Sequence, residues 1–263
     1  LVISTHSSHI AIETTFGNLR YFKRLPEGTE CAVATSKVIN LSDVFGDSDQ
    51  TNKFVTRYLQ STHCDLFFAD AAILVEGVAE SMLLPHFIRS KFPELYQRYI
   101  TILGVNGRHA HRLSPLIEKL CLPTLVITDL DPAEKEGYHK SVVLKRGEGQ
   151  ISGNYAIAKW LMKEKDIDKL VDYSEDKKEF SFASPYRFSI RLAYQTPVKV
   201  DFEGEEKEAI PGTFEDCLIY TNYDLFKKIK VTDSGNLVEQ THDLLNSNDT
   251  FEMIHEKIYK MLR

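Results

Sequence analysis

The sequence predicts an α/β fold built on a parallel sheet that is flanked by helices. Short apolar runs at 71–75, 99–103 and 123–128 alternate with helical stretches. Continuous apolar runs in this order are typical of parallel strands that are buried on both faces. The chain has 263 residues, 43% of them hydrophobic and 27% charged, so we expect a folded core and exclude wholesale disorder.

The elements of this predicted βαβαβ unit follow one another closely. The first run ends at Glu76-Gly77, and a helix to about residue 92 follows it. The second run leads to a helix at 111–120, and the third ends at Asp129-Leu130-Asp131. The helix at 111–120 carries its apolar side chains on one face, namely Leu113, Leu116, Ile117 and Leu120. That face is expected to pack on the sheet.

The remainder of the chain has a looser pattern. After residue 132 we expect, in order, a charged loop at 134–149, a helix near 154–163, an extended pair within 186–200 and an acidic loop at 203–208. Two amphipathic helices are predicted near 235–246 and 250–262. We interpret residues 134–210 as an insertion, so that a mainly helical region is inserted into or appended to the sheet. Before the sheet, a helix is predicted at 53–61.

Composition limits the classes of function and location. The net charge of −6 argues against a protein that holds nucleic acid by bulk positive charge alone. The four cysteines are scattered, which favours reduced thiols and a cytoplasmic location. We find no signal peptide and no apolar run of about 18 residues, so no membrane association is expected. The chain starts at Leu1 within a predicted strand, so we expect it to be a segment of a longer protein.

Acidic residues stand at the ends of two predicted strands. Glu76 closes the first strand, with Glu80 four residues later, where helical spacing would stack the two on one face. Asp129 and Asp131 follow the third strand, and on an extended segment their side chains would point the same way. Like charges about 4 Å apart cost on the order of 1 kcal/mol in water and about 4 kcal/mol near a protein surface. A gathering of four therefore indicates a site for Mg²⁺ or Mn²⁺.

Each half of this pattern also has a simpler interpretation. Glu76 and Glu80 could be acids at the start of a helix, where the helix dipole favours them. The sequence Asp129-Leu130-Asp131-Pro132 could be a turn, since Asp before Pro favours one. The combination, with both halves at strand ends some 50 residues apart, is the more specific signal for a metal site.

The two acidic motifs resemble those of a Toprim domain. Ile73-Leu74-Val75-Glu76-Gly77-x-x-Glu80 and Leu125-Val126-Ile127-Thr128-Asp129-Leu130-Asp131 are similar to the motifs of this metal-binding catalytic fold, which topoisomerases, primases and certain nucleases share. The opening segment, residues 1–10, resembles the last core strand and switch-histidine loop of an ABC-type ATPase. Together they resemble the OLD (overcoming lysogenization defect) family of ATP-dependent endonucleases.

The resemblance implies a two-metal DNA endonuclease with a defined set of site residues. It assigns Glu76, Glu80, Asp129 and Asp131 to the metals, and Thr213-Phe214-Glu215 matches the third family motif, so Thr213 and Glu215 would complete the site. A phosphate-stabilising lysine is expected on a C-terminal helix, where Lys257 and Lys260 are candidates. Two Mg²⁺ or Mn²⁺ ions are the implied cofactors, and DNA is the implied partner.

The resemblance also implies the domain organisation. Residues 1–62 would be the end of an ABC-type ATPase domain with a linker, and residues 63–263 a Toprim nuclease domain with its insertion and C-terminal helices. His6 matches the ATPase switch histidine, but the chain has no GxxxxGK[ST] phosphate loop, so His6 is expected to be inactive here. ATP would act only through an upstream ATPase domain, which is the implied partner in the same chain, and the intact protein could be a homodimer.

Two other functions compete with the endonuclease. A DxD phosphatase would use its first Asp as a nucleophile and would give Glu76 and Glu80 no role. A non-catalytic, metal-stabilised module could bind DNA or regulate a partner. A topoisomerase is less favoured, because none of the 12 tyrosines lies in a context recognisable for a nucleophile.

Overall fold

The computed structural model describes the residues of eleven segments: 1–7, 10, 13, 16–25, 27, 32–44, 64–105, 109–135, 141–183, 186–230 and 235–262. They form two compact units, residues 1–127 with 179–191 and residues 128–178 with 192–263. The predicted helix at 53–61 and the predicted domain boundary at 62/63 lie outside the described residues.

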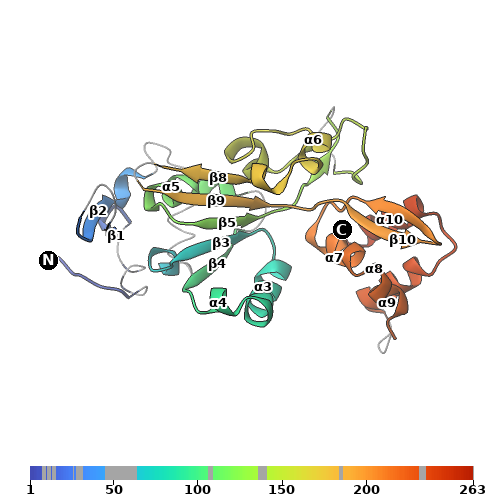
Figure 1. Cartoon of the computed structure of the whole chain (residues 1–263), viewed down its shortest axis with the longest axis horizontal. Coiled ribbons are helices and arrows are strands. Elements are labelled where there is room, and N and C mark those ends of the chain that lie inside the picture. Colours follow the sequence, from blue (N-terminus) through green and yellow to red (C-terminus); the bar gives the residue numbers. More distant parts are fainter. Residues whose placement is uncertain are drawn as a thin grey trace. The chain divides into compact units, whose positions relative to one another are not determined.

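The first unit is built on a five-stranded sheet in the order β4-β3-β5-β9-β8 (Figure 1). Its strands are β3 (Ala71–Val75), β4 (Ile100–Gly104), β5 (Thr124–Ile127), β8 (Glu179–Phe182) and β9 (Phe188–Ala193). Strand β3 pairs in parallel with both β4 and β5, whereas β8 and β9 are antiparallel. The predicted parallel core is therefore confirmed. It is part of a mixed sheet, because β8 and β9 from the predicted insertion extend it.

Helices cover both faces of this sheet. The main ones are α3 (Val78–Lys91), α4 (Pro93–Tyr96) and α5 (Ser114–Leu120), and Figure 1 shows α3 and α4 beside β3 and β4, away from α5. Ile88 of α3 packs against Ile73 and Val75 of β3. The opposite face of β3 carries Leu74, which is fully buried. The apolar face predicted for 111–120 is confirmed, because its four side chains are at most 2% exposed.

The N-terminal segment differs from the expectation. Residues 1–7 have no regular structure, and Leu1 and Val2 are fully exposed, so the strand predicted at the start of the sequence is wrong. A strand needs a hydrogen-bonded neighbour, and no described segment pairs with these residues. The hairpin β1 (Arg20–Leu25) and β2 (Thr35–Asn40) follows, with short 3₁₀ turns at Phe16–Asn18, Leu41–Asp43 and Cys64–Phe67. Lys23 ties the hairpin to α5 by donating to the carbonyl oxygens of Leu120 and Cys121.

The second unit mixes short strands and helices. Its strands are β6 (Pro132–Ala133), β7 (Ile151–Ser152), β10 (Val198–Phe202) and β11 (Glu205–Ala209). Its helices are a π-helical turn (Ala156–Trp160), α6 (Ile167–Val171), a 3₁₀ turn (Glu175–Lys178), α7 (Phe214–Thr221), α8 (Tyr223–Lys228), α9 (Leu237–Leu245) and α10 (Phe251–Met261). The helices predicted near 235–246 and 250–262 are confirmed. The residues after 210 are mainly helical, but the insertion at 134–210 is not.

The prediction of a loop at 203–208 is wrong, because most of these residues belong to a β-hairpin strand. Strands β10 and β11 form an antiparallel hairpin in which Phe202 pairs with Glu205. The two residues between them, Glu203 and Gly204, have φ values of 55° and 85°. Two consecutive positive φ values are the geometry of a tight two-residue hairpin turn. This turn directs β11 back along β10.

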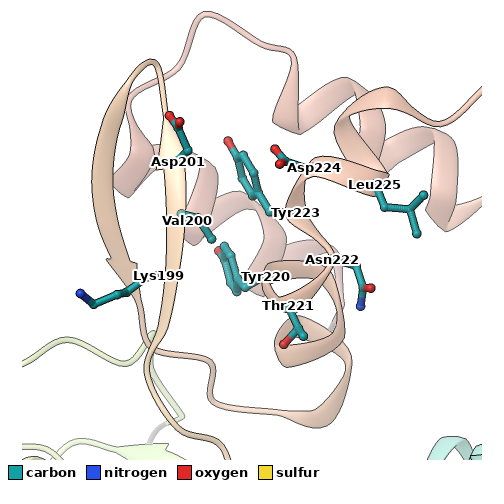
Figure 2. Close-up of a pocket in the computed structure, with 9 residues that line it drawn as sticks. All are labelled: Lys199, Val200, Asp201, Tyr220, Thr221, Asn222, Tyr223, Asp224 and Leu225. Atoms are coloured by element: carbon teal, nitrogen blue, oxygen red, sulfur yellow. The ribbon is translucent and has the colours of Figure 1, made fainter.

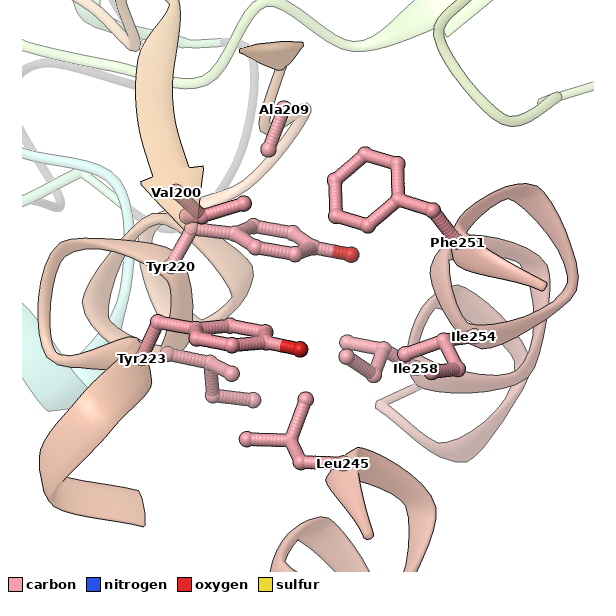
Figure 3. Close-up of a cluster of buried hydrophobic side chains, with 9 residues drawn as sticks. Val200, Ala209, Tyr220, Tyr223, Leu245, Phe251, Ile254 and Ile258 are labelled. Carbon is pink, nitrogen blue, oxygen red and sulfur yellow. The ribbon is translucent and has the colours of Figure 1, made fainter. Parts of the chain in front are cut away.

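A hydrophobic cluster joins the β10–β11 hairpin to helices α7 to α10 of the second unit (Figure 3). Phe251, Ile254 and Ile258 lie on one face of α10 at helical spacing and pack against Tyr220 and Tyr223. Ile254 and Ile258 are fully buried. The cluster therefore fixes α7, the helix that begins at a predicted site motif. No helix in the described part of the chain is long and apolar enough to cross a membrane.

Candidate functional site

Two neighbouring parallel strands of the first unit end at the same edge. Leu74 of β3 lies level with Val126 of β5, and Glu76 follows the end of β3 directly. Helix α3 begins only at Val78, with Gly77 as its N-cap. Glu76 therefore precedes the helix, and the predicted helical stacking of Glu76 on Glu80 is wrong. The carboxyl end of a parallel strand is nevertheless where α/β folds place functional groups.

Glu80 occupies a tightly enclosed place in the first turn of α3. The residue is only 3% exposed, and a Cβ atom added to Gly77 would lie 2.6 Å from Glu80 Oε2. Real Cβ atoms do not approach an oxygen this closely, so the Glu80 carboxylate can keep its position only beside a glycine. Ser81 Oγ donates to the Gly77 carbonyl at 2.9 Å, which fixes the N-cap.

The segment with Asp129 and Asp131 is not an extended strand. Strand β5 ends at Ile127, and Asp131 has a φ of 47°, in the left-handed region that Asp tolerates better than most residues. The extended backbone that was expected at 129–131 is therefore wrong at Asp131. Hydrogen bonds hold the segment instead, from Thr128 N to the Ala193 carbonyl at 3.0 Å and from Gly153 N to the Asp131 carbonyl at 2.9 Å.

Gln195 is a contact of this segment that the sequence did not reveal. Its side-chain Nε2 donates to Asp129 Oδ1 at 2.6 Å, and its Oε1 accepts from Leu130 N at 3.0 Å. Asn154, fully buried, makes a parallel contact one residue earlier by donating from Nδ2 to Thr128 Oγ1 at 2.7 Å. Amide side chains therefore hold the segment at two successive positions.

The predicted Thr213-Phe214-Glu215 motif forms the start of α7. Thr213 is the N-cap and makes a capping box with Asp216, whose Oδ1 accepts from Thr213 N at 2.9 Å and from Thr213 Oγ1 at 3.2 Å. Asp216 is only 4% exposed, and this burial raises the pKa of its carboxyl despite the bonds it accepts from Gly212 and Thr213. Glu215 lies exposed in the first turn of α7. The predicted metal ligand Glu215 is therefore more accessible than the neighbouring Asp216.

The second unit packs the Asp129–Asp131 segment against the start of α7. A Cβ atom added to Gly212 would lie 3.2 Å from both Cδ and Cγ of Pro132, so Gly212 and Pro132 are in close contact. Pro132 directly follows Asp131, and Gly212 directly precedes Thr213. This contact therefore connects the end of the Asp129–Asp131 segment with the residue before the Thr213 motif.

Comparison with known proteins identifies part of the chain. Residues 67–131 match the family model described as "Overcoming lysogenization defect protein-like, TOPRIM domain". This segment is therefore similar to the TOPRIM domain of OLD-like proteins. The TOPRIM match contains Glu76, Glu80, Asp129 and Asp131, whereas Thr213 and Glu215 lie beyond it. The predicted resemblance to the OLD family is thereby confirmed.

Two curated relatives extend the similarity beyond the TOPRIM domain. Endonuclease GajA from Bacillus cereus strain HuB5-5 is 27% identical over 277 aligned residues, which cover 99% of this chain and 36% of the relative. Endonuclease GajA from Bacillus cereus strain VD045 is 23% identical over 270 residues, which cover 97% of this chain and 43% of the relative. The chain thus spans less than half the length of these relatives.

The remaining predicted site residues lie outside the TOPRIM match. Lys257 on α10 forms an ion pair with Asp249, while Lys260, one helical turn further, is exposed. His6 is exposed in the irregular N-terminal segment. A pocket of about 330 Å³ lies at the far end of α7, lined among others by Asp201, Tyr220 and Asp224 (Figure 2). None of the predicted site residues lines it, so this pocket is not the candidate site.

The acids within the TOPRIM match fit a divalent cation by their chemistry. Within the described ranges, no three or more His, Cys, Asp and Glu side chains form a group that could already hold a metal ion. Neighbouring residues set the positions of two of these acids. Glu80 sits where only a neighbouring glycine leaves room, and Asp129 is fixed by Gln195. Carboxylate oxygens are the hard ligands that Mg²⁺ and Mn²⁺ prefer.

Proposed function

We propose that the chain is the catalytic part of a metal-dependent DNA endonuclease of the OLD family. The observation that carries the proposal is the position of the acids around β3 and β5. Glu76 follows one strand, Asp129 and Asp131 follow the other, and these adjacent parallel strands end at one edge of the sheet. The TOPRIM match spans both strand ends, and the name endonuclease of both curated relatives supports a nuclease.

In this proposal six residues hold the metals. They are Glu76, Glu80, Asp129, Asp131, Thr213 and Glu215. Two bound Mg²⁺ or Mn²⁺ ions would supply an activated water and stabilise the leaving oxygen of the phosphodiester. The chain's own contribution is to present these oxygens in fixed positions: Gly77 leaves room for the Glu80 carboxylate, and the capping box fixes the first turn of α7, where Glu215 lies.

The proposal includes partners that the whole protein would use. DNA is the substrate, and an upstream ABC-type ATPase domain of the same chain would couple cleavage to ATP. Homodimer formation by the intact protein also stays a prediction. Of the two candidate lysines, Lys260 is the better one for stabilising phosphate charge, because Lys257 is already held by Asp249.

Nicking of supercoiled plasmid tests the proposal. The chain is incubated with Mg²⁺ or Mn²⁺, and the conversion of supercoiled to open-circular and linear DNA is followed. We expect Glu76→Gln and Asp129→Asn to abolish metal-dependent nicking, because each removes a ligand charge while keeping side-chain size. Glu94→Gln is the matched control, since Glu94 is an exposed acid on α4 away from the strand ends.

The outcomes separate the competing functions. Wild-type nicking rates in Glu76→Gln and Asp129→Asn would refute the assignment. Release of phosphate from a small ester that survives Glu80→Gln would instead favour a DxD phosphatase. Tight Mn²⁺ and DNA binding by the wild-type chain without any strand breaks would favour the non-catalytic module.

A further inference from the structure

The Gln195 side chain forms a two-point clamp on the Asp129–Leu130 pair. It lies just after β9 and is only 7% exposed. One end of its amide donates to Asp129 Oδ1 at 2.6 Å, and the other accepts from Leu130 N at 3.0 Å. Because the two partners are consecutive residues, the clamp fixes the Asp129 carboxylate relative to its own backbone.

The hydrogen-bond pattern determines which way the amide faces. A backbone N–H can only donate, so the group facing Leu130 must be the oxygen Oε1. The nitrogen Nε2 must then face Asp129, where an ionised carboxylate is the matching acceptor. The reversed amide would set an oxygen against a carboxylate oxygen and an N–H against an N–H. The clamp thus requires a donor on one side and an acceptor on the other, which an amide provides.

The backbone that carries Gln195 is tied to the same segment. Thr128 N donates to the Ala193 carbonyl at 3.0 Å. Thr128 lies one residue before Asp129, and Ala193 lies two residues before Gln195. The clamp therefore spans two stretches of chain that are already held in register. The terminal carboxyl torsion of an aspartate takes a broad range of angles when nothing restrains it. The hydrogen bond from Gln195 to Asp129 Oδ1 removes rotational freedom that a bound cation would otherwise have to remove.

We propose that Gln195 is a positioning residue that orients the Asp129 carboxylate for a divalent cation. This inference rests on the proposed function, in which Asp129 binds the metal. Groups that hydrogen-bond to a metal-binding side chain typically change metal affinity by about 10- to 100-fold when they are removed. Gln195 is such a group for Asp129, although it contributes no atom to the metal or to DNA.

Gln150 offers a matched control within the same unit. It is buried to a similar extent, with 9% exposure, and its amide likewise makes two hydrogen bonds, in this case both to backbone groups. Its Oε1 accepts from Lys145 N at 3.0 Å and its Nε2 donates to the Val143 carbonyl at 2.8 Å. Gln150→Ala therefore removes two hydrogen bonds from a buried amide, as Gln195→Ala does, but leaves the contacts of Asp129 intact.

The test measures Mn²⁺ binding by the whole chain in the absence of DNA, by calorimetry, together with the melting temperature. We expect Gln195→Ala to weaken Mn²⁺ binding by about 10- to 100-fold, and Gln150→Ala to leave it within about 2-fold of the wild type. Similar losses of melting temperature in the two variants would show that the effect on binding is not a general loss of stability. Gln195→Met keeps the approximate side-chain size, adds no charge and removes both hydrogen bonds of the amide, so it should also weaken binding.

The results distinguish failure of this inference from failure of the proposed function. If Asp129→Asn loses Mn²⁺ binding but Gln195→Ala and Gln195→Met bind as the wild type does, the positioning role is wrong and the metal site stands. If Gln195→Ala does not fold, Gln195→Met decides, and wild-type affinity in that variant overturns the inference. If the wild-type chain binds no Mn²⁺, both proposals fall together.

Discussion

The close approach of Gly77 to Glu80 predicts that Gly77→Ala, which adds one methyl group, lowers nuclease activity much more than it lowers stability. In Gly77→Ala the new Cβ would lie 2.6 Å from Glu80 Oε2, below any distance that real Cβ atoms show. The backbone itself accepts alanine, because Gly77 has a φ of −121° and a ψ of 177°, which is ordinary extended geometry. The strain therefore falls on the Glu80 side chain alone.

The size of the displacement follows from the contact. Real Cβ atoms keep at least 3.0 Å, and ordinary van der Waals contact begins at 3.4 Å, so the carboxylate must move by about 0.4–0.8 Å from its present 2.6 Å. Misplacement of a catalytic group by about 1 Å can cost about 100-fold in rate. Stability should change by only about 1 kcal/mol. Alanine is a poorer N-cap than glycine, which offsets the gain of about 0.4–1 kcal/mol through the unfolded chain, and a side chain about 30° off its rotamer costs about 0.5–1.5 kcal/mol.

Plasmid nicking and thermal unfolding measured on the same samples test this reasoning. We expect Gly77→Ala to lower the metal-dependent nicking rate by about 100-fold while the free energy of unfolding changes by no more than about 1 kcal/mol. Gly104→Ala is the matched control at the end of β4, where the new Cβ would meet Ser81 Oγ at 3.2 Å and needs only a few tenths of an ångström. Nicking and Mn²⁺ binding at wild-type levels in Gly77→Ala would refute a role for the Glu80 position.

Three further predictions concern the second unit. Burial and the charge of Lys145 lower the pKa of His255 below 6.5, so the unfolded chain takes up a proton first as the pH falls. The free energy of unfolding should therefore decrease below about pH 6.5. His255→Asn should reduce this pH dependence in urea titrations from about pH 7 to about pH 5. Ile254→Ala leaves a cavity in the cluster under α7 and should cost about 2–5 kcal/mol in chemical denaturation. Asp131→Ala should be about 1 kcal/mol less stable than Asp131→Asn, because Asn tolerates the positive φ better; equal stabilities would show that the backbone relaxes.

The parallel core could be predicted because its strands are buried on both faces. Strand β3 has the predicted bounds Ala71–Val75, and β5 lies within the predicted run. Burial on both faces requires continuous apolar side chains, which leaves a plain pattern in the sequence. The same holds for α5, whose apolar face follows helical spacing. Because strand ends are set by these patterns, the positions of Glu76 and Asp129 relative to the strands could be predicted too.

The second unit could be predicted less completely, for physical reasons. Strand β11 reads Glu-Glu-Lys-Glu-Ala and buries only Ala209, so it has no apolar alternation to detect. Helix α7 has eight residues, too few for a clear helical period. Gln195 makes its contacts with residues 65 and 66 positions away, and a single Gln carries no spacing rule. Such contacts exist only once the chain is folded.

The sequence Asp129-Leu130-Asp131-Pro132 had two interpretations, a turn and a set of metal ligands. The structure gives a reason why the two interpretations are compatible. The chain leaves β5 at Ile127 and must turn before β6 begins at Pro132. A residue before proline avoids the right-handed helical region, and Asp is one of the few residues that accept the left-handed one. Asp131 does so with a φ of 47°. An aspartate is thus favoured at this position by the backbone as well as by its charge, and a turn stabilised by Gln195, Asn154 and Gly153 is a rigid way to present carboxylates at the end of a strand.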